Sequence, residues 1–151
     1  MKSFLLSIHI LAGILFVGPV ALSTSLFPRY APVAATAAGT EDAGRSFDTA
    51  GLLHRITRRY GVLALVIPVV GLALAVAQRR TTEVWVLVAM VLTAIAGGLL
   101  ALQITPRQRE ALASPDDGVE LRRLGMLSGI FNLLWAAVVV LMIVRPGSSS
   151  A

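Results

Sequence analysis

The sequence predicts an all-α integral membrane protein, folded as a four-helix bundle with up-down-up-down topology. Hydrophobic residues make up 56% of the 151 residues and charged residues only 14%, and the mean hydropathy is +0.81. A soluble domain of this length has too little interior to bury so much apolar surface. Four apolar segments are each long enough to cross a hydrocarbon core of about 30 Å as a helix. The length favours a single domain, 1–151.

The four expected spans alternate with polar connections. We place the spans near residues 4–27, 58–78, 84–104 and 124–144. The long connections are 28–57 and 105–123. The remaining connection, RRTTE, is so short that the second and third spans must form an antiparallel hairpin. The tail 146–151, PGSSSA, is typical of a disordered terminus.

The first span carries a histidine, His9, in the stretch SIHILAGILFVGPV. Its apolar part, from Phe4 to Leu22, is longer than the hydrophobic region of a signal peptide, so we expect a retained span. An ionisable ring at membrane depth is costly unless it has a hydrogen-bond partner or binds a ligand. His9 is therefore a residue whose role needs an explanation.

Each long connection contains a helix signal. The first half of 28–57 is rich in Pro, Ala, Gly and Thr, which is typical of a mobile loop. Its second half places Phe47 and Leu53 among charges, which predicts an interfacial helix leading into the second span. In 105–123, the sequence Pro-Asp-Asp-Gly at 115–118 interrupts the chain. Its acids are predicted caps for a helix that begins before the fourth span.

Small residues are expected to hold the helices together, because lipid is as apolar as leucine and association in a bilayer depends on close approach. They recur at spacings of three and four, which places them on one helix face. The expected packing positions are Gly61, Ala64, Pro68 and Gly71 in the second span, Ala94, Gly97 and Ala101 in the third, and Gly125, Gly129 and Asn132 in the fourth. Asn132 should form an interhelical hydrogen bond. Pro19 and Pro68 should kink their helices.

The distribution of positive charge predicts the orientation. Nine arginines lie in or beside the two long connections, and only four Lys and Arg residues lie at the opposite ends of the spans. Cytoplasmic segments carry the excess of Lys and Arg. We therefore expect a multi-pass protein of the bacterial plasma membrane, with the long connections in the cytoplasm and both termini outside.

Several function classes are disfavoured. No Asp, Glu, Lys or Arg lies in the middle of a span, although coupled transporters normally need such groups there. No nucleotide-binding, zinc-protease or nucleophile-elbow motif is present, and cysteine is absent. The pI is near 11.1, but the basic residues flank spans, as topology requires, so nucleic acid is not an expected partner. No catalytic residue can be assigned.

Three interpretations of His9 remain open: a packed polar residue bonded to Ser7 or to a backbone carbonyl, a haem ligand, or a copper ligand. His54 lies before the second span on the cytoplasmic side, so the two histidines cannot clamp one haem. Met90 and Met142 lie at the depth of His9. A thioether is a suitable partner ligand for haem iron or for copper(I).

A basic cluster surrounds His54 in LLHRITRRY. Arg55, Arg58 and Arg59 are expected to hold anionic lipid head groups. The alternative is that they bind another anion, such as a phosphate or the carboxylates of a porphyrin. Trp85 is typical of an interfacial anchor, while Trp135 lies near mid-span and should pack inside.

The stretches HILAGILFVGP…LFPRY, RRYGVLALVIPVVGLAL, QITPRQREAL and VVVLMIVRPG together resemble a family of bacterial four-span predicted integral membrane proteins of unknown function. That family is similar in turn to the transmembrane part of copper-resistance protein D and to the haem-dependent membrane protoporphyrinogen oxidase. The resemblance covers nearly the whole chain, through short apolar motifs. It implies haem b binding at His9. The other matching positions are Arg58, Arg59, Tyr60, Pro68 and Gly71.

One departure from the oxidase pattern concerns the third span. The oxidase uses a lysine shortly after a tryptophan there, whereas Trp85 is followed by Val86, Leu87 and Val88, and the span contains no lysine. The leading hypothesis is thus a small non-catalytic membrane protein with no cofactor, a structural or accessory component that packs with lipid, a larger membrane complex or further copies of itself. The alternatives are a haem-b-binding redox protein and a copper-handling protein.

Overall fold

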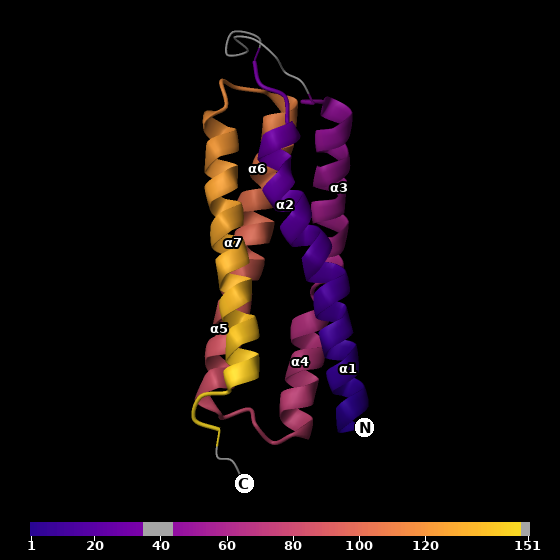
Figure 1. The fold of residues 1–151 in the computed structure, drawn as a ribbon, viewed down its shortest axis with the longest axis vertical. Helices are drawn as coiled ribbons and strands as arrows, with labels where there is room; N and C mark the ends of the chain where they lie inside the picture. Colours follow the sequence, from indigo (N-terminus) through magenta and orange to yellow (C-terminus); the bar gives the residue numbers. More distant parts are fainter. Residues whose placement is uncertain (35–43, 149–151) are drawn as a thin grey trace.

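The computed structural model describes residues 1–34 and 44–148, and they fold into four long helical segments (Figure 1). The segments are Ser3–Tyr30, Phe47–Ala77, Val84–Ala113 and Val119–Val144. Each is long and apolar enough to cross a membrane. The predicted all-α four-helix bundle is therefore confirmed, and the chain is a multi-pass membrane protein.

Three of the four segments are divided into shorter helices. The first comprises α1 (Lys2–Ala12), the π-helical turn η1 (Gly13–Val17) and α2 (Gly18–Tyr30), and the second comprises α3 (Phe47–Leu63) and α4 (Val66–Ala77). The third comprises α5 (Val84–Leu99), the π-helical turn η2 (Leu100–Ile104) and α6 (Thr105–Ala113), while α7 (Val119–Val144) is the whole of the fourth.

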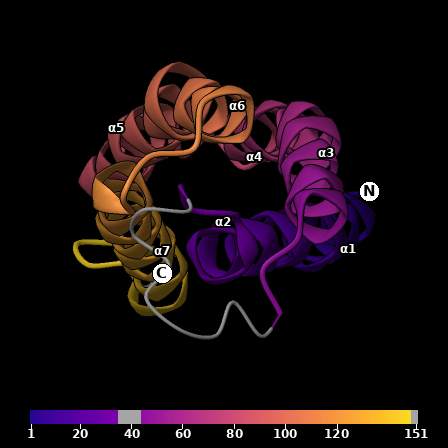
Figure 2. The same cartoon turned by 90° about the horizontal axis from the view of Figure 1, so that it is seen from above.

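The four segments surround a common axis in chain order, so that each is a neighbour of the next and α7 packs back on α2 (Figure 2). The N-terminus, the turn between α4 and α5 and the end of α7 lie together, at what we call the terminal end (Figure 1). The end of α2, the start of α3 and the turn between α6 and α7 lie at the other end, the loop end (Figure 1).

The helices are longer at the loop end than the sequence indicates. Part of each predicted connection, 28–57 and 105–123, is helical, because α3 begins at Phe47 and α6 continues to Ala113. Ser46 caps α3 by accepting hydrogen bonds from the backbone N–H groups of residues 48 and 49, at 3.2 and 3.4 Å. The expected interfacial helix is thus the start of a bundle helix that buries Leu53. The expected mobile loop falls largely on residues 35–43, and half of the expected tail on 149–151, outside the described residues.

The predicted kinks coincide with interruptions of the α-helical hydrogen bonding. Pro68 has no N–H to continue the helix, and a turn of two residues separates α3 from α4, with Ile67 N–H donating to the Ala64 carbonyl at 3.0 Å. The kink expected at Pro68 is therefore confirmed. Pro19 lies in the first turn of α2, directly after η1.

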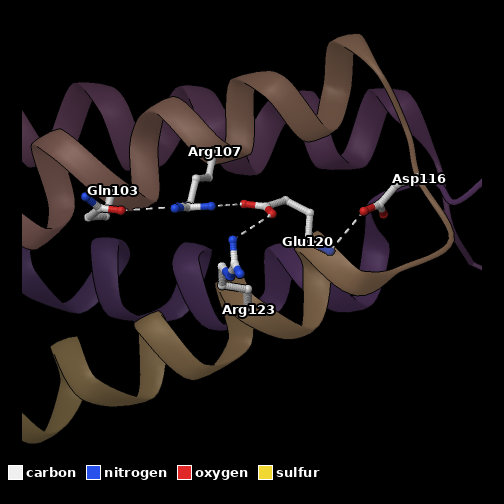
Figure 3. Close-up of polar contacts among 5 residues, drawn as sticks. All are labelled: Gln103, Arg107, Asp116, Glu120 and Arg123. Atoms are coloured by element: carbon white, nitrogen blue, oxygen red, sulfur yellow. Dashed lines mark hydrogen bonds and ion pairs between the residues drawn. The ribbon is translucent and has the colours of Figure 1, made fainter.

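Asp116 determines where the last helix begins. Its carboxylate accepts from the backbone N–H of Gly118 at 2.8 Å and from that of Glu120 at 3.0 Å. Gly118 has a φ of 91°, which a residue without a Cβ adopts freely. Arg107 on α6 donates a hydrogen bond to the Glu120 carboxylate, and Arg123 forms an ion pair with the same carboxylate (Figure 3). The contact with Arg107 connects α6 to α7 beside this turn. The predicted acidic cap is confirmed.

The main hydrophobic core lies towards the loop end, where all four segments pack on one another. One of its two phenylalanines, Phe27, is fully buried. The core residues are Val20, Phe27, Ala31, Ala50, Leu53, Ala96, Leu100, Ile104, Ala111, Leu121, Leu124 and Phe131. The loop-end half of the bundle is therefore the part that holds the fold together.

Candidate functional site

The terminal-end half of the bundle is split into two helix pairs. There α1 packs on α4 and α5 packs on α7, whereas α4 and α5 make few contacts (Figure 1). A cavity of about 570 Å³ lies between the pairs. Its size is within the range of about 300–1,000 Å³ that is usual for small-molecule sites. We call this part of the molecule the split half.

The cavity is long and mostly apolar. On α4 its lining runs from Leu65 to Gln78, and on α5 from Trp85 to Gly98. Each run spans thirteen residue steps, or about 20 Å at the helical rise per residue. The polar side chains in the lining are His9, Gln78, Arg80, Trp85, Thr93, Trp135 and Arg145. The cavity therefore offers a long apolar channel with a few polar groups.

Small residues in the third segment line this cavity. Ala94 and Gly97 were expected to pack against another helix, but both are exposed and border the cavity instead. The buried residues of α5 are Val86, Ala89 and Ala96. At these positions the small side chains leave part of the space between the two helix pairs unfilled.

The predicted packing positions differ in what they contact. A Cβ on Gly61 would meet the Leu100 side chain at 3.1 Å, and one on Gly125 would lie 4.0 Å from Pro28. Gly129 is exposed, and no heavy atom lies within 4 Å of where its Cβ would be. Of the two further positions in the second segment, Ala64 is half-buried and Pro68 is exposed. Pro68 lines the cavity.

Asn132 makes the interhelical hydrogen bond that the sequence predicts, because its Nδ2 donates to the Ser25 hydroxyl on α2 at 3.0 Å. Its Oδ1 is buried, and no described residue forms a hydrogen bond with it. Close by on α7, Trp135 packs on the core and lines the cavity, and its indole Nε1 is buried without a hydrogen-bond partner among the described residues.

His9 docks against α4. The ring is only 8% exposed. A Cβ on Gly71 would lie 2.8 Å from His9 Cε1 and 3.3 Å from Nδ1, so the absence of a side chain at Gly71 makes room for the ring. The ring lies beside the backbone of Ile67, and its Nδ1 is buried without a hydrogen-bond partner among the described residues. Ser7 bonds instead to the carbonyl of Ser3.

His9, Met90 and Met142 all line the same cavity, as their expected depth suggested. The arrangement of His9 nevertheless fits a haem or copper ligand poorly, because its ring packs against Gly71, with Nδ1 facing that residue, and lies beside the backbone of Ile67. A metal ion needs a ring nitrogen with a free lone pair directed at it. In the described part of the chain, no group of three or more His, Cys, Asp or Glu side chains is placed to hold a metal.

Two arginines at the terminal-end mouth of the cavity were not singled out by sequence reasoning. Arg80 lies in the turn after α4, and Arg145 follows α7. The guanidinium of Arg145 lies 5.8 Å from the centre of the Trp85 ring, and the indole of Trp85 donates to Glu83. The sequence showed these arginines only as charges that flank two spans, 65 positions apart in the chain.

A set of polar side chains connected by hydrogen bonds lies inside the loop-end half of the bundle, beyond the cavity. His54 Nδ1 and Gln108 Oε1 lie 3.1 Å apart, Gln108 Nε2 donates to Thr57 at 3.5 Å, and the hydroxyls of Thr57 and Ser23 are 2.8 Å apart. Gln108, Thr57 and Ser23 are buried. This chain of hydrogen bonds joins α2, α3 and α6, and sequence reasoning missed Gln108.

The basic cluster beside His54 lies on the outside of the bundle. Arg55, Arg58 and Arg59 are exposed, whereas the His54 side chain faces inwards to Gln108. Thirteen residue steps along one segment, or about 20 Å, separate His54 from Ile67, the residue beside the His9 ring. The two histidines are thus far apart, as the sequence indicates.

Comparisons with protein families, with curated proteins and with solved structures find no match to this chain.

Proposed function

We propose that this chain is a non-catalytic membrane protein that holds a lipid-soluble molecule in the cavity of its split half. The observation that carries the proposal is the cavity of about 570 Å³ between the α1–α4 and α5–α7 pairs. Its apolar lining suits an apolar molecule, since burying apolar surface provides most of the binding free energy at such sites.

The residues around the cavity favour binding over catalysis. Its charged lining residues, Arg80 and Arg145, are both at the terminal-end mouth. General acid–base catalysis needs a titratable group within hydrogen-bond reach of the reacting atoms. His9 is the one such group deeper in the described lining, and its ring is engaged with Gly71 and Ile67. We therefore assign His9 a packing role.

Haem b and copper are the second candidate class of ligand for the same cavity. The observation in their favour is that His9, Met90 and Met142 border one cavity. Either ligand requires the His9 ring to leave its contacts with Gly71 and Ile67. Because the lipid-soluble molecule requires no such rearrangement, it is the preferred ligand.

The proposed orientation in the membrane is based on the distribution of Lys and Arg residues. We place the protein in the bacterial plasma membrane with the loop end in the cytoplasm, because nine arginines lie in or beside the long connections, against four Lys and Arg at the other end. The exposed guanidinium groups of Arg55, Arg58 and Arg59 then meet the anionic head groups of the inner leaflet. The split half lies in the outer leaflet.

Two glycine variants test the proposed binding. Gly97→Leu fills the cavity, because Gly97 lines it and nothing lies within 4 Å of its Cβ position. Gly129→Leu is the matched control, since Gly129 is equally open but does not line the cavity. The protein is purified in mild detergent, and the molecules extracted from it are quantified by mass spectrometry. We expect a molecule that co-purifies with wild type and Gly129→Leu and is depleted in Gly97→Leu; equal extracts from all three proteins overturn the proposal.

A further inference from the structure

We propose that the molecule held in the cavity is an amphiphile with a negatively charged head group, bound at the terminal-end mouth by Arg80 and Arg145. This inference rests on the proposed function and adds the chemical class of the ligand. It is carried by the charges at the mouth and by the length of the apolar channel behind them.

The channel matches an extended hydrocarbon chain. Its lining runs along α4 from Leu65 to Gln78 and along α5 from Trp85 to Gly98, which corresponds to about 20 Å on each helix. The arginines lie at one end of this length, next to Gln78 and Trp85, and the rest of the described lining carries no Lys, Arg, Asp or Glu side chain. A ligand with a charged group at the mouth and a hydrocarbon chain along the channel therefore matches both the arginines and the apolar lining.

Arg145 is held by contacts that, among the described residues, leave its two outer nitrogens available. Its Nε donates to the carbonyl of Met142 at 3.1 Å, and its guanidinium carbon lies over the Trp85 ring, 5.8 Å from the ring centre. Among the described residues no carboxylate forms an ion pair with it. Guanidinium groups bind carboxylates and phosphates through paired N–H donors, and a group already fixed in position loses less side-chain entropy on binding.

Arg80 adds a second positive charge at the mouth. Its Nε lies 3.6 Å from Glu83 Oε1, a long ion pair, and its side chain is 33% exposed. Glu83 is also bonded to the Trp85 indole, so one carboxylate is shared between Arg80 and Trp85. Two arginines and one glutamate leave an excess of one positive charge beside the apolar channel. An anionic head group neutralises that excess, whereas a neutral one does not.

The two tryptophans of the chain, Trp85 and Trp135, both line the cavity and serve as reporters. Bromine on a bound chain quenches tryptophan fluorescence. The full chain, reconstituted in phosphatidylcholine nanodiscs, is titrated with 9,10-dibromostearic acid, its methyl ester, dibrominated phosphatidylglycerol and dibrominated phosphatidylcholine. Quenching of the Gly97→Leu variant measures contact from lipid outside the cavity and is subtracted.

We expect both anionic probes to bind more tightly than their neutral counterparts. Arg80→Gln and Arg145→Gln should each weaken the anionic probes about fivefold, as expected for one arginine near a membrane surface, and leave the methyl ester unchanged. Arg79→Gln is the matched control, because Arg79 is exposed in the same turn but does not line the cavity. Preference for the fatty acid or for phosphatidylglycerol identifies the head group as a carboxylate or a phosphate.

The outcomes separate this inference from the proposed function. Equal binding of the acid and its methyl ester, with no effect of the two arginine variants, overturns the inference while the cavity still binds. Quenching that is the same in Gly97→Leu and in wild type for every probe overturns the proposed function as well.

Discussion

The imidazole of His9 lies directly on the backbone of Gly71, where a Cβ would come within 2.8 Å of His9 Cε1. This contact joins α1 to α4 and forms one of the two helix pairs of the split half. A larger residue at position 71 requires the ring to shift, because the ring occupies the space that a Cβ would need.

We expect Gly71→Ala to lower the free energy of unfolding. The added methyl group overpacks the joint at a cost of about 1–3 kcal/mol, which is partly offset by the better helix propensity of Ala, about 1 kcal/mol. Unfolding by SDS measures the change. Gly51→Ala is the control, because Gly51 lies in the same segment and nothing is within 4 Å of its Cβ position.

A double variant tests whether the ring of His9 is the cause. His9→Ala in the Gly71→Ala background removes the clash, so the two changes should be less than additive by about 0.5 kcal/mol or more. Strict additivity would show that the two side chains do not meet.

Replacement of Gln108 by Leu should destabilise the loop-end half. It removes the partner of His54 Nδ1 and one donor to Thr57, at a cost of about 1 kcal/mol, as for hydrogen bonds between membrane helices. Gln103→Leu, on the exposed side of the same segment, should change the unfolding free energy by less than about 0.5 kcal/mol. Equal effects of the two variants in SDS unfolding would contradict the importance of this hydrogen-bond chain.

Asp116→Ala should weaken the start of α7. The variant loses two capping hydrogen bonds, worth about 1 kcal/mol. Its neighbour Asp117 is exposed, so Asp117→Ala removes the same charge without the cap and should be nearly neutral. Amide hydrogen exchange at residues 119–122 provides the measurement: faster exchange is expected in the Asp116 variant alone.

An absorption spectrum of the protein purified in mild detergent separates the ligand classes. We expect no Soret band and no bound copper by elemental analysis, because His9 is engaged with Gly71 and Ile67. A Soret band with reduced α and β bands that disappears in His9→Ala would replace the proposed function with the haem alternative.

The orientation can be tested with single cysteines, since the chain has none of its own. Thr82 lies exposed in the turn between α4 and α5, while residue 40 is outside the described part of the chain. Thr82→Cys in intact cells should react with an impermeant thiol reagent, and Thr40→Cys should be protected. The reverse pattern would place the loop end outside.

The sequence determined the class of fold because membrane insertion depends on local composition. About 20 consecutive apolar residues are required for a span, and four such segments are visible without any knowledge of their contacts. Helix caps are equally local, so Asp116 was identified as a cap from its position before α7. The start of α3 and the end of α6 are not local in this sense. Polar residues there, such as Gln108, are helical and buried because they have hydrogen-bond partners on other segments.

The cavity was decided by the tertiary structure. Gly71 and Gly97 both line the cavity, yet a Cβ on Gly71 would meet the His9 ring, whereas nothing lies within 4 Å of the Cβ position of Gly97. The surroundings of the two glycines differ because of how each helix is rotated and how far apart the helices lie. Both depend on packing between segments that are distant in the chain. For the same reason Arg80 and Arg145, each a simple flanking charge in the sequence, meet at one mouth only when α7 returns beside α5.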